Sequence, residues 1–152
     1  METILPILER LIVADNGIRS AAEAQYKHWQ SIGSEDLCVA LLQVIGEVNI
    51  NMPLRILAAV LLRRLLIEDN NGQTLQEMTE TRQAEFCQLL LVTLDQEVTM
   101  SLKLKICDIV GELGGYIIEE GEWPDVLPFT YRLLTVSFYL CIHVYIYIFL
   151  DF

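Results

Sequence analysis

The chain has 152 residues, of which 21 are acidic and 10 are basic, so its formal net charge is −11. Such a length matches one domain with a buried core. The acidic balance excludes general nucleic-acid binding, which requires clustered Lys and Arg to displace counterions from phosphates, and it favours a basic protein as partner.

Four cysteines are spread widely along the chain without a CxxC pair: Cys38, Cys87, Cys107 and Cys141. Each lies among apolar residues, which is typical of reduced core cysteines in an intracellular protein. The N-terminus lacks the positively charged start and the small-residue cleavage site of a secretory signal.

The first two expected helices cover residues 3–13 and 16–30. An apolar stripe with helical spacing marks the first of them and consists of Ile4, Leu8, Leu11 and Ile12. Asp15 is expected to cap the second helix, in which Arg19 and Glu23 have the spacing of an i,i+4 ion pair.

The next two expected helices cover residues 35–47 and 53–66. Ser34 is expected to cap the first of them, which has acidic residues in its first turn. The second reads PLRILAAVLLRRLL, and it is too short and too interrupted by Arg55 to span a membrane, so a buried helix is expected. Residues 68–73 (EDNNGQ) have the composition of a loop.

Three further helices are expected to begin near residues 80, 100 and 124, the middle one with Thr99 as its cap. No segment before residue 132 alternates with period two over a length typical of a strand. The pattern therefore predicts an all-α body.

These helices group in pairs, and a basic residue in each second helix follows a polar turn residue by four positions. The residues that we interpret as holding neighbouring pairs together are Asp15, Arg19, Asn51, Arg55 and Lys105. The spacings between the three basic residues bracket the roughly 40–47 residues of HEAT and armadillo units. An ordinary helical bundle has the same apolar stripes and remains the alternative.

Three segments, in this order, resemble the N-terminal HEAT repeats of the importin-β superfamily. They read DNGIRSAAEAQY from residue 15, LRILAAVLLRRLL from residue 54 and LKICDIVGELGGYIIEEGEWPDVLPF from residue 104. The resemblance is strongest to the karyopherin beta-3 (importin five) branch, with the importin four branch next, and it covers about residues 3–129.

This resemblance implies a right-handed α-solenoid of about three HEAT-type helical pairs over residues 1–132. It further implies a nuclear import receptor, or a truncated form of one, that works in the cytoplasm and nucleus, including the nuclear envelope and pore. A full receptor of this family binds cargo proteins and nuclear pore proteins. Its N-terminal repeats bind the Ran GTPase in its GTP form through concave second helices, expected here at residues 17–30, 52–66 and 100–118.

Four charged residues are the candidates for contact with such a partner: Arg63, Arg64, Asp108 and Glu112. The two arginines end a helix, where cations also complement the helix dipole. The two acids are four residues apart and form a stripe that would meet basic residues of Ran, although a solvated helix face has the same pattern.

No residue pattern points to an enzyme. The two histidines, His28 and His143, lie far from each other and from a plausible nucleophile, and the sequence has no phosphate-binding glycine loop. We therefore expect no catalytic residue, no cofactor and no metal site.

The composition changes after residue 132, and residues 133–150 contain no charged side chain. One interpretation of residues 133–152 is an atypical terminus produced by read-through or truncation. A second is a membrane anchor, since about 20 apolar residues can cross a bilayer, and the chain would then be a tail-anchored helical-repeat adaptor for protein–protein interaction. A third is a buried element of the fold.

Overall fold

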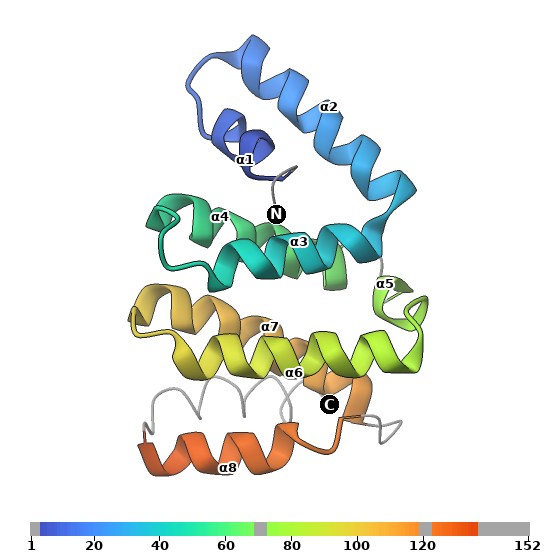
Figure 1. The fold of residues 1–152 in the computed structure, drawn as a ribbon, viewed down its shortest axis with the longest axis vertical. Coiled ribbons are helices and arrows are strands. Elements are labelled where there is room, and N and C mark those ends of the chain that lie inside the picture. Colours follow the sequence, from blue (N-terminus) through green and yellow to red (C-terminus); the bar gives the residue numbers. More distant parts are fainter. Residues whose placement is uncertain (1–3, 69–72, 119–122, 137–152) are drawn as a thin grey trace.

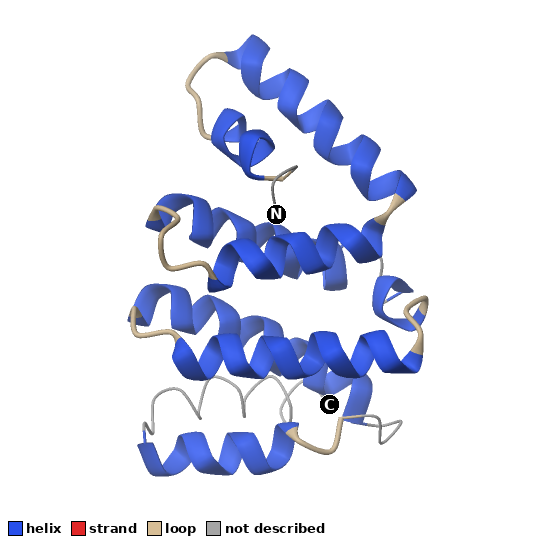
Figure 2. Cartoon of the chain, in the orientation of Figure 1, coloured by secondary structure: helices blue, strands red, loops and turns tan. Residues whose placement is uncertain are grey.

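A computed structural model describes residues 4–68, 73–118 and 123–136, and each regular element within these ranges is helical (Figure 1, Figure 2). The elements are α1 (Leu5–Leu11), α2 (Asn16–Ile32), α3 (Ser34–Gly46), α4 (Met52–Arg63), the π-helix η1 (Arg64–Glu68), α5 (Gln73–Gln76), α6 (Glu80–Gln96), α7 (Met100–Ile118) and α8 (Val126–Val136). The prediction of an all-α chain is confirmed for the described residues.

Polar side chains set the starts of three long helices. Asp15 Oδ1 accepts a hydrogen bond from the Ile18 N–H at 3.0 Å and caps α2 as predicted. Asn51 Oδ1 accepts from the Leu54 N–H at 3.1 Å and caps α4. Thr79 accepts from the backbone N–H of the third residue of α6 at 3.4 Å.

The predicted cap at Ser34 is wrong, because Ser34 is the first residue inside α3 and the cap position belongs to Gly33. Helix α2 continues to Ile32, so one residue is left to separate two helices. The Gly33 N–H donates to the Trp29 carbonyl and its own carbonyl accepts from the Leu37 N–H, so that Gly33 ends α2 and begins α3.

Consecutive helices pack as pairs: α1 with α2, α3 with α4, and α6 with α7. The second and third pairs lie side by side, with α3 next to α6 in one layer and α4 next to α7 in the other (Figure 1). The first pair is arranged differently, because α2 crosses α3 at a slant and α1 contacts α4.

One apolar core runs through all three pairs and includes Leu8, Leu41, Leu90 and Ile106, none of which is exposed. Ala58 and Ala59 on α4 are also buried, and their small side chains allow close approach of neighbouring helices. In the first helix the predicted stripe is only partly correct. Ile4 and Leu8 are buried and Leu11 is half-buried, but Ile12 is 53% exposed because α1 ends before it; Ile7 is buried instead.

Helix α8 (Val126–Val136) runs through the predicted boundary between the helical-repeat domain, residues 1–132, and the apolar tail, residues 133–152. Most of the segment 133–152, to which the three interpretations of the tail refer, lies outside the described residues. Among the helices of the described ranges, none combines the length and the apolar composition needed to cross a bilayer.

Candidate protein-binding surface

Charged side chains from α4, η1 and α7 lie at one surface. Arg63 is the last residue of α4, and Arg64 follows as the first residue of η1. Lys105, Asp108 and Glu112 form a row on α7, because their spacing of three and four residues places them on one helical face. Since α4 packs along α7, Arg63 meets this row, and together they form what we call the α4–α7 surface.

An ion pair joins the end of α4 to the last residue of the α7 row. Arg63 Nε donates to Glu112 Oε1 at 2.9 Å, and a second nitrogen of the same guanidinium contacts the same oxygen. The Glu112 side chain is only 11% exposed, so this carboxylate depends on Arg63 for its main counter-charge. Its other oxygen, Oε2, is buried and has no hydrogen-bond partner in the described structure.

A small cavity of about 160 Å³ opens beside this ion pair. It is lined by Ala59, Val60, Arg63, Arg64, Lys105 and Asp108. Lys105 Nζ lies 3.8 Å from Asp108 Oδ2, one turn further along α7. The structure thus brings all four predicted partner-contact residues to one surface: Arg63, Arg64 and Asp108 line the cavity, and Glu112 contacts Arg63 beside it.

The π-helical turn η1 follows α4 directly and changes which side chains face the core. A π-helix closes its hydrogen bonds over five residues instead of four, and such turns occur frequently at functional sites. Here Leu65 and Leu66 are both completely buried, whereas Arg64, which precedes them, is exposed. The turn therefore keeps Arg64 at the rim of the cavity while the chain continues into the core.

Among the five predicted repeat-stacking residues, Arg55 connects one helix pair to the next. Its buried guanidinium forms an ion pair with Glu97, in the turn between α6 and α7, and its Nε donates to the Ile45 carbonyl at 2.8 Å. Arg19 has its contacts within α2: its guanidinium donates a hydrogen bond to Asn16 Oδ1, and its Nε lies 3.9 Å from Glu23 Oε1.

The remaining three predicted stacking residues have local contacts. Asp15 and Asn51 cap their own helices, and Lys105 pairs with Asp108 on its own helix. The positional counterpart of Arg55 in α7 is Lys103, because the N–H of each donates to the carbonyl four residues earlier, at Asn51 and at Thr99.

The partner of Arg55, Glu97, was not assigned a role from the sequence. Glu47 and Glu97 both end a first helix, and each is followed by an exposed valine. Their carboxylates accept from the N–H two residues ahead, Asn49 at 3.0 Å and Thr99 at 2.7 Å. The repeated Glu-Val dipeptide is the sequence signal that could have identified this turn.

The electrostatics of Glu97 follow from these contacts. Burial by itself raises the pKa of the Glu97 carboxyl, but hydrogen bonds from Thr99 and the charge of Arg55 outweigh it, so the pKa lies below its ordinary range. Glu97 is consequently ionised at neutral pH and forms a true ion pair with Arg55.

Side chains that could bind a metal ion do not gather at one place in the described ranges. Within residues 4–68, 73–118 and 123–136, no three His, Cys, Asp or Glu side chains gather closely enough to hold a metal ion. Cys38, Cys87 and Cys107 are buried, and His28 is exposed near the end of α2. Cys141 and His143 lie outside the described residues.

A comparison with models of known protein families found no family model that matches this chain.

Proposed function

We propose that this chain is a non-enzymatic binding protein that contacts a protein partner through the α4–α7 surface. The partner would be the Ran GTPase in its GTP form, and the three helix pairs would be HEAT-type repeats at the start of a solenoid. In a full-length receptor this would serve protein import into the nucleus, with cargo and pore proteins bound by further repeats.

The observation that carries this proposal is that Arg63, Arg64 and Asp108, from α4, η1 and α7, line one cavity, and that Glu112 joins them through its ion pair with Arg63. Alternating charges on a fixed helical surface suit recognition of a partner with the complementary pattern, because they favour correct pairings and penalise wrong ones. The ion pair between Arg63 and Glu112 holds the side chains in place before binding, which reduces the entropy lost on association.

The sharpest test exchanges the two charges of this ion pair. The double variant Arg63→Glu with Glu112→Arg keeps an ion pair between α4 and α7 but reverses the sign at each position. We expect the far-UV circular dichroism spectrum to stay unchanged and binding of Ran loaded with a non-hydrolysable GTP analogue to weaken at least about tenfold, measured by biolayer interferometry.

A matched control exchanges the charges of a different ion pair between helix pairs, Arg82→Glu with Glu35→Arg, on α6 and α3. This variant should bind GTP-loaded Ran like the unmodified chain. GDP-loaded Ran should bind neither protein. Unchanged binding of the first variant, or equal binding of the GTP and GDP forms, would refute the proposal.

A further inference from the structure

A groove on the other layer of the molecule, between α6 and α8, is formed by two adjoining hollows of about 450 and 590 Å³. The hollows share Gln88, Val92 and Asp125, so they form one continuous depression, which we call the α6–α8 groove. Its lining extends from Ala84 to Asp95, which corresponds to about three turns of α6, or roughly 16 Å.

The walls of the groove are mainly apolar and are partly open to solvent. Leu89 and Val92, one turn apart on α6, are 40% and 36% exposed. Opposite them, Trp123 and Phe129 are largely buried and form the side of the groove that precedes and begins α8. Apolar side chains left open along one depression are typical of a surface that another chain covers.

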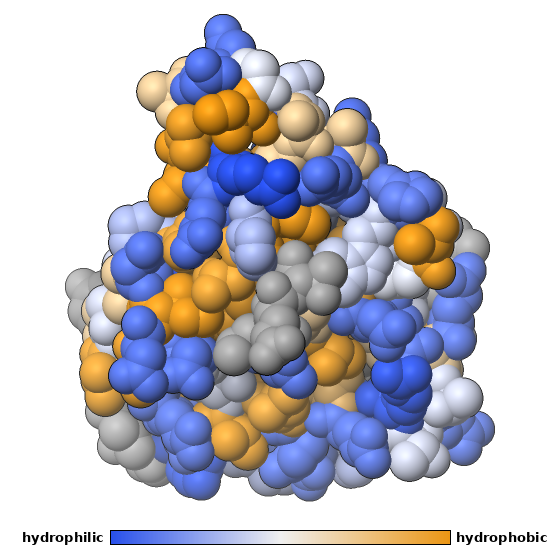
Figure 3. Space-filling model, turned by 45° about the horizontal axis from the view of Figure 1, so that its top comes forward, coloured by the Kyte–Doolittle hydropathy of each residue, from blue (hydrophilic) through white to orange (hydrophobic). Residues whose placement is uncertain are grey.

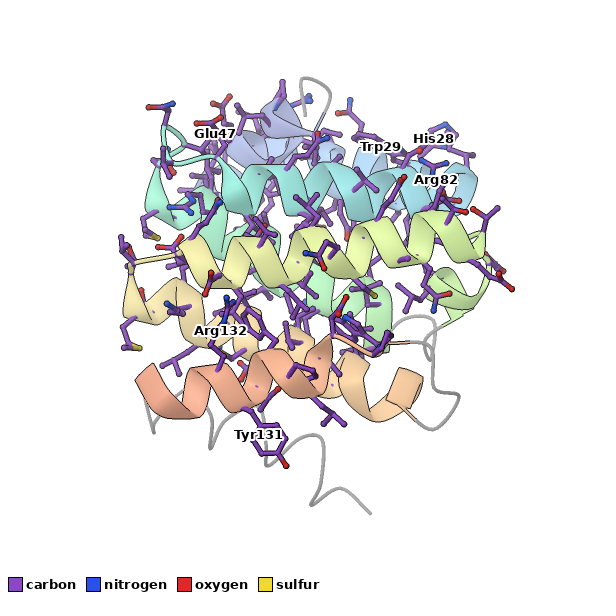
Figure 4. The ribbon with its side chains drawn as sticks, turned by 60° about the horizontal axis from the view of Figure 1, so that its bottom comes forward. His28, Trp29, Glu47, Arg82, Tyr131 and Arg132 are labelled. Carbon is purple, nitrogen blue, oxygen red and sulfur yellow. The ribbon has the colours of Figure 1, made fainter. Side chains whose placement is uncertain are left out.

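Charge differs between the two ends of this groove. At one end Arg132 lies 3.2 Å from Asp95 and stacks over the Phe129 ring, 5.0 Å from its centre, so the charges there are matched. Figure 4 shows Arg132 on the α6 side of α8 and Tyr131 on the opposite side.

In the other hollow the carboxylates of Glu85 and Asp125 form part of the lining beside Trp123, with Asp125 at the point where the two hollows meet. Among the described residues, no cation lies within ion-pair distance of either of these two carboxylates. The neighbouring cation on α6, Arg82, pairs with Glu35 and Asp36 on α3.

From this arrangement we propose that the α6–α8 groove binds an amphipathic basic peptide segment of another protein, about three helical turns long. Its apolar side chains contact Leu89 and Val92, and a Lys or Arg near one end pairs with Glu85 and Asp125. Helices placed in apolar grooves recognise their sites through side chains spaced three and four residues apart. The proposal concerns a different layer from the α4–α7 surface and does not depend on Ran binding.

Trp123 offers a direct probe, because the chain contains two tryptophans and Trp29→Phe leaves only the one in the groove. The experiment titrates this variant with two synthetic helical peptides of twelve residues. Both carry leucines at i, i+4 and i+7, one with lysines at one end and the other with glutamates at the same positions. We expect saturable change of Trp123 fluorescence with the lysine peptide and at least tenfold weaker binding of the glutamate peptide.

Two changes in the groove and one outside it complete the test. Glu85→Lys with Asp125→Lys should weaken binding of the lysine peptide about tenfold and reverse the preference between the two peptides, which an unfolded protein could not do. Val92→Asp should weaken both peptides. Glu9→Lys with Glu23→Lys, on α1 and α2, changes the net charge equally and should leave binding unaltered.

Three results would overturn the proposal. The first is the absence of a saturable fluorescence change with either peptide. The second is equal binding of both peptides, which indicates apolar adhesion without charge recognition. The third is a concentration-dependent dimer in sedimentation equilibrium that Val92→Asp abolishes, which would assign the groove to a second copy of this chain.

Discussion

The junction between the first and second helix pairs differs in kind from the junction between the second and third. Arginines from α4 and α6 cross the second junction and form ion pairs: Arg55 with Glu97, Arg63 with Glu112, and Arg82 with Glu35 and Asp36. Across the first junction, the described residues form no ion pair. Arg10, for example, donates to Gln25 and to the Pro6 carbonyl within its own pair.

The helix arrangement follows the same division. Where ion pairs cross the junction, α6 lies alongside α3 and α7 alongside α4, whereas α2 crosses α3 at a slant (Figure 1). Viewed with the first pair forward, the surface there shows apolar patches between hydrophilic residues (Figure 3). Ile12 and Ile18 are among the exposed apolar side chains of this pair. Apolar contact is non-directional and tolerates several crossing angles, whereas a buried ion pair requires one register.

The largest expected effect comes from breaking the buried ion pair of the second junction. Arg55→Ala leaves the Glu97 carboxylate buried without its counter-charge, so we expect a loss of about 3–5 kcal/mol in the free energy of unfolding, measured by urea titration. The double variant Arg55→Met with Glu97→Leu should recover most of that loss. A single-variant loss below about 1 kcal/mol would show that the ion pair does not hold this junction.

A cavity in the first pair should have the next largest effect. Leu8→Ala removes a fully buried side chain and should cost about 3 kcal/mol. Amide hydrogen exchange should accelerate mainly in α1 and α2, because no ion pair links their described residues to the second pair. Equal acceleration in α6 and α7 would show that the two junctions are cooperative rather than distinct.

Acid should weaken the second junction selectively. The folded-state pKa of Glu97 lies below its ordinary value, so its contribution is complete above the unfolded pKa of about 4.3 and is lost as the pH falls through the folded value. The stability difference between the unmodified chain and Glu97→Gln should therefore narrow between about pH 5 and pH 3, in urea titrations at each pH. A difference that stays constant over this range would contradict the assignment.

The smallest effect is expected for the exposed ion pairs. Arg82 is about half exposed, so Arg82→Ala should cost about 0.5 kcal/mol and less at high salt, since solvent screens such pairs. Arg19→Ala, which removes a pair within α2, is the matched control and should cost about 0.3 kcal/mol. Thermal unfolding in low salt and in 1 M salt distinguishes the small, salt-dependent losses of stability expected for Arg82→Ala and Arg19→Ala from the large loss expected for Arg55→Ala.

Local sequence signals predicted much of this fold. The cap at Asp15, the start of α4 near Pro53 and the start of α6 at Glu80 follow from residues within one turn of each helix end, and all three are confirmed. The error at Ser34 is also local, because the sequence did not show that α2 uses every residue up to Gly33.

Contacts between distant residues could not be predicted in the same way. Arg63 and Glu112 are separated by several helices, and neither carries a pattern that selects the other. The repeat pattern did suggest a basic residue on α7, but Lys105 lies two residues beyond Lys103, about 200° around the helix. The turn before α7 has a different length from the turn before α4, so the residue that corresponds to Arg55 lies at a different distance from the preceding helix.

The buried thiols give the second and third pairs a chemical property that the first pair lacks. Cys38 on α3, Cys87 on α6 and Cys107 on α7 are enclosed in the core, and the sequence before Gly33 contains no cysteine. Burial, and then the charge of Glu35, raises the pKa of the Cys38 thiol, so an alkylating reagent meets very little thiolate while α3 stays packed. Modification at Cys38 thus has to wait for α3 to open, and its alkylation rate records how often this helix opens in the native protein.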